Sequence, residues 1–348
     1  MIESVEMRFR RRGFEGAIAD NFAPSEITKQ DPTSIAHIVR FRSDSTGDRL
    51  RSIAYLEPLL WGWRIDRKYT KDEIRKAQLF RLDWKHAPMQ DGDLSCYDIS
   101  GMCDFCGAGR KQISDLVLDL KRLPRRNNFV KTFSDEVVIS RDAAAILMSY
   151  DLTGFLLRPV QHSRSRYNSR LNLPAVPSGR RLIRAAEDLG FEYQSVGFDE
   201  WLNRKGHPLR RSEHEALFKL AMAEGLSQME KSDHTNKMPA WFQVVPVGAK
   251  SRLALNTRFG YSPLDDDKRG QYRCPLGHTE GWALLSEAYV DRGSWVGFDY
   301  SVSEQLYGQH PIGSVFYARP VVIISPRMRQ ALESAGIRGW IAELAHFE

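Results

Sequence analysis

Two distant segments of the chain carry residues whose types and spacing suit a metal ion. The first reads Cys103-Asp-Phe-Cys106-Gly107, with two thiols three residues apart. This spacing lets both thiolates point at one ion while backbone N–H groups of the turn face the sulfurs, and the glycine permits the tight turn. The pattern predicts half of a tetrahedral zinc site.

The other ligands must come from elsewhere, because a structural zinc ion takes four. The second segment, Cys274-Pro-Leu-Gly277-His278, has suitable residue types. We therefore predict a structural Cys₃His zinc site with these ligands: Cys103, Cys106, Cys274 and His278. Cys96 is an alternative ligand, and His86 is a more distant reserve.

Three other interpretations of the first cysteine pair stay open. A redox pair would open a helix after a strand, whereas Gly107-Ala-Gly109 favours a turn. A decayed site without metal would agree with the altered second segment. A catalytic zinc ion would need an open coordination position and a general base, but the sequence has no HExxH or deaminase pattern, since His214-Glu215 lacks the second histidine.

Other catalytic motifs are absent from the sequence, which has no Walker A loop, no GxGxxG and no GxSxG. The carboxylates of Asp265-Asp266-Asp267 lie between Pro263 and Gly270, where solvated side chains are expected rather than a cation site. We therefore expect a protein without catalytic activity of its own.

The elements that must position the ligands are repeated within the chain. Residues 137–158 and 322–343 align without a gap at a shift of 185 positions. Each segment predicts a β-branched strand, an N-capping serine, a helix of about ten residues and a glycine turn into a second strand. The identical pairs include Ile139 and Ile324, Ser140 and Ser325, Leu147 and Leu332, Ser149 and Ser334, and Gly154 and Gly339. We interpret the two segments as diverged copies of one unit.

The sequence thus predicts an α+β fold with four regions: an N-terminal α+β region (1–90), repeat copy one with its CxxC knuckle (91–160), a basic, partly helical insertion (161–270), and repeat copy two with its CxxxH half-site (271–348). In the first region, Trp61, Trp63 and Trp84 are expected in the core. In the insertion, the spacing of Ser212 and Glu215 predicts the start of a helix.

Composition and charge narrow the class of protein. The chain is 42% hydrophobic and 27% charged, as in ordinary globular proteins, and its net charge is +6. Residues 158–211 hold eleven Lys or Arg against five Asp or Glu. This basic excess suits nucleic-acid phosphates or an acidic protein. The candidate partner-binding residues are Arg164, Arg166, Arg170, Arg180 and Arg181.

The sequence also indicates a cellular location. It has no apolar run of the ~20 residues that cross a bilayer, so no membrane partner is expected. The N-terminal basic cluster lacks the hydrophobic segment of a secretion signal, and four cysteines are too few for a disulfide scaffold in a chain of 348 residues. These features predict a cytoplasmic protein.

The stretches 95–160 and 272–348 resemble the double-CXXCG motif family, which occurs as paralogues in myxobacteria and their relatives. The resemblance rests on Cys103-Asp-Phe-Cys106-Gly107-Ala-Gly109-Arg110, Leu116-Val-Leu-Asp-Leu120, Leu123-Pro124, Val138-Ile-Ser140, Leu152-Thr-Gly154-Phe155 and Arg158-Pro159-Val160. The second segment departs from the family, because it reads Cys274-Pro-Leu-Gly277-His278 instead of CxxCG, and residues 1–90 and 161–270 are additional.

Members of that family are regarded as immunity proteins that neutralise toxins exchanged between bacterial cells. The resemblance therefore implies that this protein binds a toxin directly. A basic immunity protein would suit a toxin with an acidic surface, because complementary charge steers the encounter. The alternative is a nucleic-acid-binding zinc protein that acts through residues 158–211.

Overall fold

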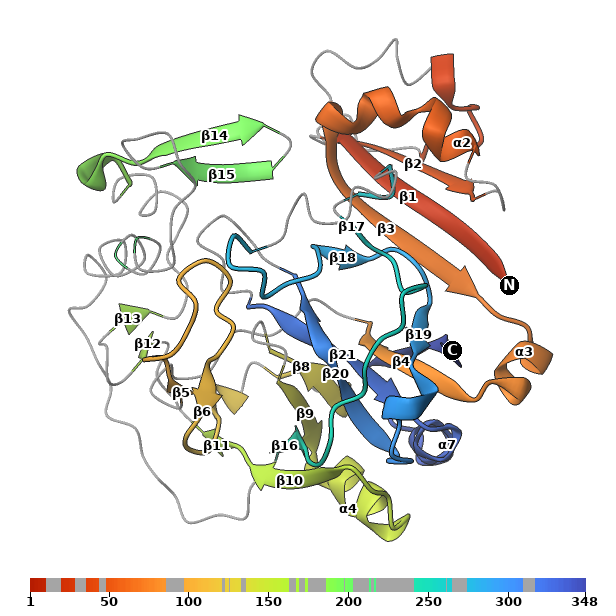
Figure 1. The fold of residues 1–348 in the computed structure, drawn as a ribbon, viewed down its shortest axis with the longest axis vertical. Helices are drawn as coiled ribbons and strands as arrows, with labels where there is room; N and C mark the ends of the chain where they lie inside the picture. Colours follow the sequence, from red (N-terminus) through yellow and green to blue (C-terminus); the bar gives the residue numbers. More distant parts are fainter. Residues whose placement is uncertain are drawn as a thin grey trace.

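The computed structural model has a mixed α+β fold in which strands far outnumber helices, so the α+β part of the prediction is confirmed. The residues that it describes are 1–10, 20–28, 36–43, 48–85, 97–120, 123–124, 126–132, 136–162, 167–168, 173–174, 186–196, 198–202, 213, 216, 241–260, 262–264, 274–308 and 317–348. Figure 1 shows the N-terminal sheet at one end of the long axis and helix α4 at the other.

The N-terminal region forms an antiparallel sheet of order β2-β1-β3. Its strands are β1 (Ile2–Arg10), β2 (Ala36–Arg42) and β3 (Leu60–Lys68). Along β1, Val5, Met7 and Phe9 alternate with polar residues and are fully buried, so one face of the sheet covers a core. Trp63 packs against this core, as predicted. The same core contains side chains from the short elements α2 (Asp48–Ser52) and η1 (Ala54–Leu59) and from the residue between them.

Two larger sheets form the rest of the body. One has the order β10-β16-β9-β8 and the other β19-β22-β4-β21-β20. The strands of the first are β8 (Phe129–Lys131), β9 (Val137–Ser140), β10 (Phe155–Pro159) and β16 (Trp241–Pro246). The strands of the second are β4 (Leu79–Trp84), β19 (Ala288–Val290), β20 (Tyr300–Tyr307), β21 (Arg319–Ile324) and β22 (Trp340–Phe347). Helix α4 (Arg141–Ser149) joins β9 to β10, and helix α7 (Pro326–Ser334) joins β21 to β22.

Both aligned segments therefore fold as strand, helix and strand, and the local reasons are shared. The hydroxyl of Ser140 accepts a hydrogen bond from the backbone N–H of Ala143, and that of Ser325 accepts one from Met328. Each bond satisfies an otherwise free N–H at the helix start. Pro326 takes the first helical position, where its missing N–H costs nothing. The two helices cover residues that differ in number by 185 at both ends.

The pairing register is also the same in both sheets. In the first sheet, Val244 of β16 lies opposite both Val137 and Leu157. In the second sheet, Leu82 of β4 lies opposite both Val322 and Ala342. The partners of Leu82 are those of Val244 shifted by 185 positions, so β4 and β16 occupy equivalent central places.

Two backbone hydrogen bonds at equivalent positions link the strand–helix–strand unit of each sheet to the other sheet. The backbone N–H of Tyr300 donates to the carbonyl of Thr153 (3.1 Å), and that of Phe129 donates to the carbonyl of Arg338 (3.1 Å). Helices α4 and α7 share one apolar core with both sheets. The fully or nearly fully buried members of that core include Phe80, Phe129, Ile139, Ala143, Leu147, Tyr300, Ile324, Met328, Ala331 and Leu332.

The central strands are exchanged with respect to chain order. Strand β4 belongs to the part of the chain that precedes copy one, within the region 1–90, yet it is central in the sheet of copy two. Strand β16 follows copy one and precedes copy two, yet it is central in the sheet of copy one. The first sheet thus takes its central strand from residues 161–270, and the second sheet takes its central strand from residues 1–90.

The N-terminal sheet is joined to this body by a buried arginine. The Nε of Arg67 donates to Glu3 (2.8 Å) and its Nη1 donates to Glu343 of β22 (3.0 Å), while a third nitrogen donates to the carbonyl of Leu285 (2.6 Å). Arg81 also pairs with Glu343, at 3.1 Å. Strand β3 is therefore tied to the second large sheet, and helix α3 (Lys71–Lys76) connects β3 to β4.

The described part of the insertion, residues 161–270, is mostly strand. It includes the hairpins β12 (Tyr167–Asn168) with β13 (Leu173–Pro174) and β14 (Glu192–Val196) with β15 (Phe198–Leu202). Of the helix predicted from Ser212, the structure describes only Glu213 and Ala216, and both are helical. Short strand pairs complete the fold: β5 (Tyr97–Asp98) with β6 (Lys111–Gln112), β7 (Val117–Leu118) with β11 (Gln161–His162), and β17 (Phe259–Gly260) with β18 (Ala283–Leu284). Within the part of the chain that the structure describes, no helix is long and apolar enough to cross a membrane.

Candidate metal centre

The first cysteine pair lies in a tight loop between β5 and β6. The backbone N–H of Cys103 donates to the carbonyl of Ala108 (2.8 Å), and that of Gly107 donates to the carbonyl of Cys103 (2.9 Å). Gly107 has a φ of 72° and Gly109 a φ of 90°, a left-handed conformation that other residues rarely adopt. The two glycines therefore explain why the sequence turns here, as predicted.

The loop directs backbone donors at the sulfurs. Burial alone would raise the pKa of the Cys103 thiol, but hydrogen bonds from the backbone of Cys106 and Phe105, and then from Cys274 and His278, lower it to about 7. The pKa of Cys106 is raised, because its thiol is buried and lies near two other cysteines. A bound cation would favour the thiolate at every one of these positions.

The second half-site is a shorter turn fixed to strand β20. The backbone N–H of Gly277 donates to the carbonyl of Cys274 (2.7 Å), and Gly277 has a φ of 78°. The N–H of Cys274 donates to the hydroxyl of Thr279 (2.9 Å). Thr279 in turn forms a bridge to Leu306 of β20, so the turn has a defined place on the second sheet.

The two half-sites meet, and the four predicted ligands form one cluster. The Sγ atoms of Cys103 and Cys274 are 3.5 Å apart, and Nδ1 of His278 is 3.7 Å from the Sγ atoms of both Cys106 and Cys274. All four ligand atoms lie within 4.8 Å of one another. Metal–sulfur bonds of about 2.3 Å in a tetrahedron place neighbouring sulfurs about 3.8 Å apart, so the cluster could hold a metal ion.

The burial of the ligands also fits a bound cation. The three cysteines are buried, whereas His278 is exposed. The cysteines are free thiols, and the separation of 3.5 Å is well beyond the ~2.05 Å of a disulfide bond. Cys96 and His86, the alternative ligands, lie outside the described residues.

Side chains that the sequence did not reveal fix the first loop to its surroundings. The guanidinium of Arg110 lies between two aromatic rings, 4.0 Å from the ring centre of Tyr97 and 3.9 Å from that of Tyr317. It also pairs with Glu136 at 3.1 Å, and both charged side chains are buried. The backbone N–H of Ala318 donates to the carbonyl of Cys106 (3.0 Å). The loop is thus attached to the segment that enters β21.

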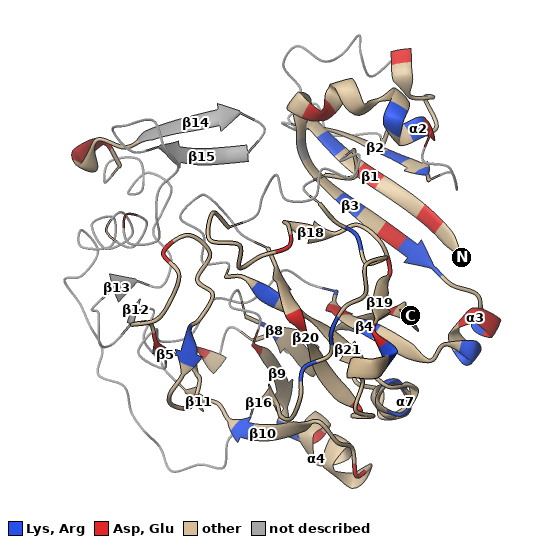
Figure 2. Cartoon of the chain, viewed as in Figure 1, with Lys and Arg blue, Asp and Glu red and all other residues tan. Residues whose placement is uncertain are grey.

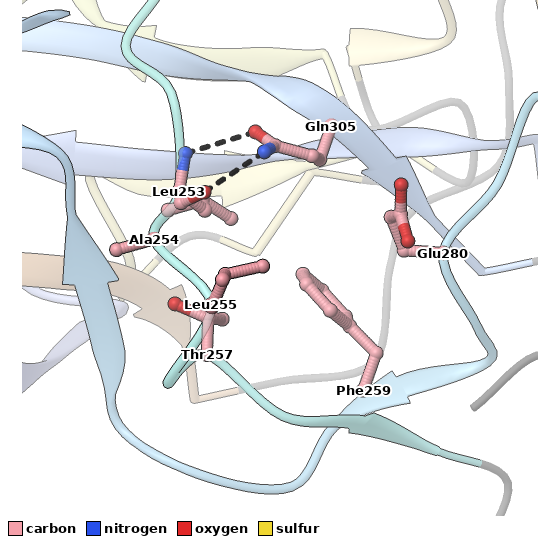
Figure 3. A pocket seen from close by; sticks show the side chains of 7 residues that line it. All are labelled: Leu253, Ala254, Leu255, Thr257, Phe259, Glu280 and Gln305. Carbon is pink, nitrogen blue, oxygen red and sulfur yellow. Dashed lines mark hydrogen bonds between the residues drawn. The ribbon is translucent and has the colours of Figure 1, made fainter. Parts of the chain in front are cut away.

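A small hollow lies close to the second half-site and is drawn in Figure 3. Its volume is about 110 Å³, and its lining is mainly apolar with Glu280 at one side. Both ends of the Gln305 side-chain amide are hydrogen-bonded to Leu253. Its oxygen accepts from the backbone N–H of Leu253, and its nitrogen donates to the backbone carbonyl of Leu253, each at 2.9 Å. The polar side chains among its lining residues are those of Thr257, Glu280 and Gln305, and the hydroxyl of Thr257 donates to the carbonyl of Tyr289 (2.9 Å).

The predicted partner-binding arginines lie outside the described residues: Arg164, Arg166, Arg170, Arg180 and Arg181. Comparison of the chain with protein families, with curated proteins and with solved structures finds no match.

Proposed function

We propose that this chain is a non-enzymatic binding protein whose two repeat copies are held together by a structural zinc ion. The observation that carries this proposal is the cluster of four ligands, of which two precede and two follow the insertion at residues 161–270. Four protein ligands fill a tetrahedron and leave no open position for a substrate or a reactive water molecule. Such a set serves stability rather than catalysis.

The donor atoms select the ion. Three thiolates and one imidazole are soft or borderline ligands, which favour zinc over magnesium or calcium. Zinc also prefers the tetrahedral arrangement that the separations of 3.5 and 3.7 Å support. When bound, zinc would join loops that the sequence separates by about 170 residues.

The duplication is part of the same proposal. The shift of 185 positions relates the strands, the helices, the serine caps and the glycine turns of the two copies. The ligands do not keep this shift, because Cys274 follows Cys103 by 171 positions, but each half-site has one cysteine at the start of its turn and a second ligand near the end. A unit that was duplicated with its half-site would give a metal site shared between the copies.

The partner follows from the resemblance to double-CXXCG immunity proteins, which rests on residues 95–160 and 272–348. We propose that the protein neutralises a bacterial toxin in the cytoplasm by direct binding. The main alternative is nucleic-acid binding through the basic segment 158–211, and the salt dependence of binding would distinguish the two.

Two measurements test the proposal. Elemental mass spectrometry of the purified protein should find about one zinc ion per chain, and the Cys274→Ser/His278→Ala variant should lose it. Toxins encoded in the same gene neighbourhood should form an equimolar complex in native mass spectrometry, and co-expression should restore growth. A protein without zinc would remove the metal part of the proposal. Failure to bind any such toxin, together with tight salt-sensitive binding of DNA, would replace the immunity part by the alternative.

A further inference from the structure

The outer face of the N-terminal sheet carries a cluster of arginines around one glutamate. Glu6 of β1 lies directly opposite Arg40 of β2 on one side and Arg64 of β3 on the other. Arg8 is two positions further along β1, and so it projects from the same face. Figure 2 shows blue and red segments along these three strands. The opposite face of the sheet is the apolar one that covers the core.

Glu6 organises this cluster because it is shared among the arginines. Its Oε1 accepts from Arg8 (3.1 Å), its Oε2 accepts from Arg40, and Nη2 of Arg64 is 3.7 Å away. Only 6% of the Glu6 side chain is exposed. The pKa of Glu6 is lowered, because hydrogen bonds from Arg40 and Arg8 and the charge of Arg64 outweigh the effect of burial. One ionised carboxylate therefore fixes the positions of three guanidinium groups.

The three arginines carry three positive charges, whereas Glu6 carries one negative charge, and they have more N–H donors than one carboxylate can accept. Their side chains are 49%, 54% and 56% exposed for Arg8, Arg40 and Arg64, so their outer edges face the solvent. Each guanidinium has five N–H donors. Nε and Nη2 of Arg64 both donate hydrogen bonds to the carboxylate of Asp66. By strand alternation, the described face has five basic residues against two acidic ones: Arg8, Arg40, Arg42, Arg64 and Lys68 against Glu6 and Asp66.

We propose that this face is a docking surface for carboxylate side chains of an acidic protein partner. The inference rests on the proposed function as a binding protein, and the residues that it names are different from those of the basic segment 158–211. Guanidinium groups held in place by a buried carboxylate lose little freedom when they bind a second carboxylate, and the pair forms two parallel hydrogen bonds. Arginine is also among the residues that contribute most to protein interfaces.

The composition of the face favours a protein over a nucleic acid. Among its described residues none is aromatic, so no ring is present to stack on bases. Asp66 would repel a phosphate chain that ran along the sheet, whereas a protein surface can place a cation opposite it. Ile2 and Ile38 add apolar contact at two corners. The face measures roughly 20 by 10 Å from strand geometry, which suits the centre of an interface rather than all of it.

The test measures binding of fluorescein-labelled poly-L-glutamate to the full-length protein by fluorescence anisotropy. The Arg40→Gln/Arg64→Gln variant should bind the probe about tenfold more weakly than the wild type. Its matched control is Arg75→Gln/Lys76→Gln on helix α3, which removes the same charge from side chains that are 77% and 74% exposed, and which should change affinity less than about twofold. Arg40→Lys keeps the charge and should still weaken binding, because lysine cannot form the paired bonds.

The inference would be overturned by an equal loss in the control variant, by no loss in the face variant, or by tighter binding of a mixed-sequence DNA duplex that depends on the same arginines. Vesicles of phosphatidylglycerol are included, and tighter binding to them through Arg40 and Arg64 would equally overturn it. Circular dichroism of each variant confirms that the fold is retained. Because no toxin or metal measurement enters this experiment, its failure leaves the proposed function to be judged by the zinc content and the toxin complex.

Discussion

Leu82 and Val244 occupy equivalent positions in two different sheets. Leu82 lies between Val322 and Ala342, and Val244 lies between Val137 and Leu157. Both residues belong to the apolar core that the two sheets share. Since each comes from a strand outside the aligned segments, the correspondence extends beyond what the sequence alignment covers. The two sheets therefore share one arrangement of four strands and one helix.

The glycines at the contact between the copies give the first prediction. Gly339 has a φ of 108°, and a Cβ atom there would overlap the carbonyl oxygen of Phe129. Gly339→Ala should lower the free energy of unfolding by about 3 kcal/mol or more, since backbone strain and a steric clash add. Gly297→Ala is the matched control, because Gly297 has a φ of 84° but no heavy atom within 4 Å of the added Cβ. It should lose only about 1 kcal/mol.

Urea unfolding followed by circular dichroism measures both glycine variants. Gly154 stands in the place that corresponds to Gly339, with a φ of 91° and the carbonyl oxygen of Tyr300 in the way. Gly154→Ala should therefore behave like Gly339→Ala. Equal losses in all three variants would show that backbone conformation alone sets the cost and that the close contact between the copies is absent.

The metal site gives the second prediction. Cys103→Ser/Cys106→Ser should lower the free energy of unfolding by at least about 3 kcal/mol, because metal binding adds directly to folding stability. A strong chelator should lower the melting temperature of the wild type but should have little effect on this variant. Asp104→Ser, an exposed change inside the same loop, is the control and should melt like the wild type. An unchanged melting temperature in the double variant would contradict a structural role for the metal.

The pH dependence of stability gives the third prediction. The pKa of Glu6 is lowered in the folded protein by the arginines around it. The ionised form therefore stabilises the fold above the ordinary glutamate pKa of about 4.3, and this contribution is lost as the pH falls through the lower folded value. Glu6→Gln should unfold at lower urea concentration than the wild type at pH 7, and the difference should shrink near pH 3.

A matched control for this pH effect is Glu304→Gln. The side chain of Glu304 is 49% exposed and pairs with Arg252 at 3.3 Å on the surface. Surface pairs of this kind contribute less than about 1 kcal/mol, so the control should follow the wild type at both pH values. A difference for Glu6→Gln that persists at low pH would mean that lost packing, and not the lost charge, causes the effect.

The sequence predicted those parts of the fold whose signals are local. A serine cap, a short apolar helix and a glycine turn occur within about twenty residues, so the strand–helix–strand units could be identified in both copies. The ligand set could be predicted because cysteine and histidine restrict the choice of partners. The places of the central strands β4 and β16 could not be predicted from the sequence. The two strands share only one identical residue at equivalent positions, Phe80 in β4 and Phe242 in β16. Which sheet a strand joins depends on distant contacts.

The supporting residues of the site were missed for a similar reason. Arg110 and Glu136 are 26 positions apart, and Tyr317 comes from the other copy. No spacing rule connects an arginine to two tyrosines across such distances. The cluster around Glu6, in contrast, has a signal in the sequence, because charged residues alternate with apolar ones in β1 from Val5 to Arg10. Reading that alternation would have identified the outer face, although not its partners on β2 and β3.

The exchange of the central strands gives the fourth prediction. If a protease site is inserted between β15 and β16 and cleaved in the folded protein, the two fragments should stay together on size-exclusion chromatography. Strand β4 of the N-terminal fragment lies between β22 and β21 of the C-terminal fragment. Strand β16 of the C-terminal fragment lies between β10 and β9 of the N-terminal fragment. Two metal ligands on each fragment add to this association.

Separation of the cleaved fragments should require a denaturant, and a chelator should lower the concentration needed. Pro substitutions in the central strands test the cause. Val244→Pro removes an N–H in the middle of the first sheet and should release the fragments, because a central strand cannot spare a ladder bond. Val296→Pro at an exposed position outside these strands is the control and should leave them associated. Fragments that separate without denaturant would show that each sheet is complete within its own side of the chain.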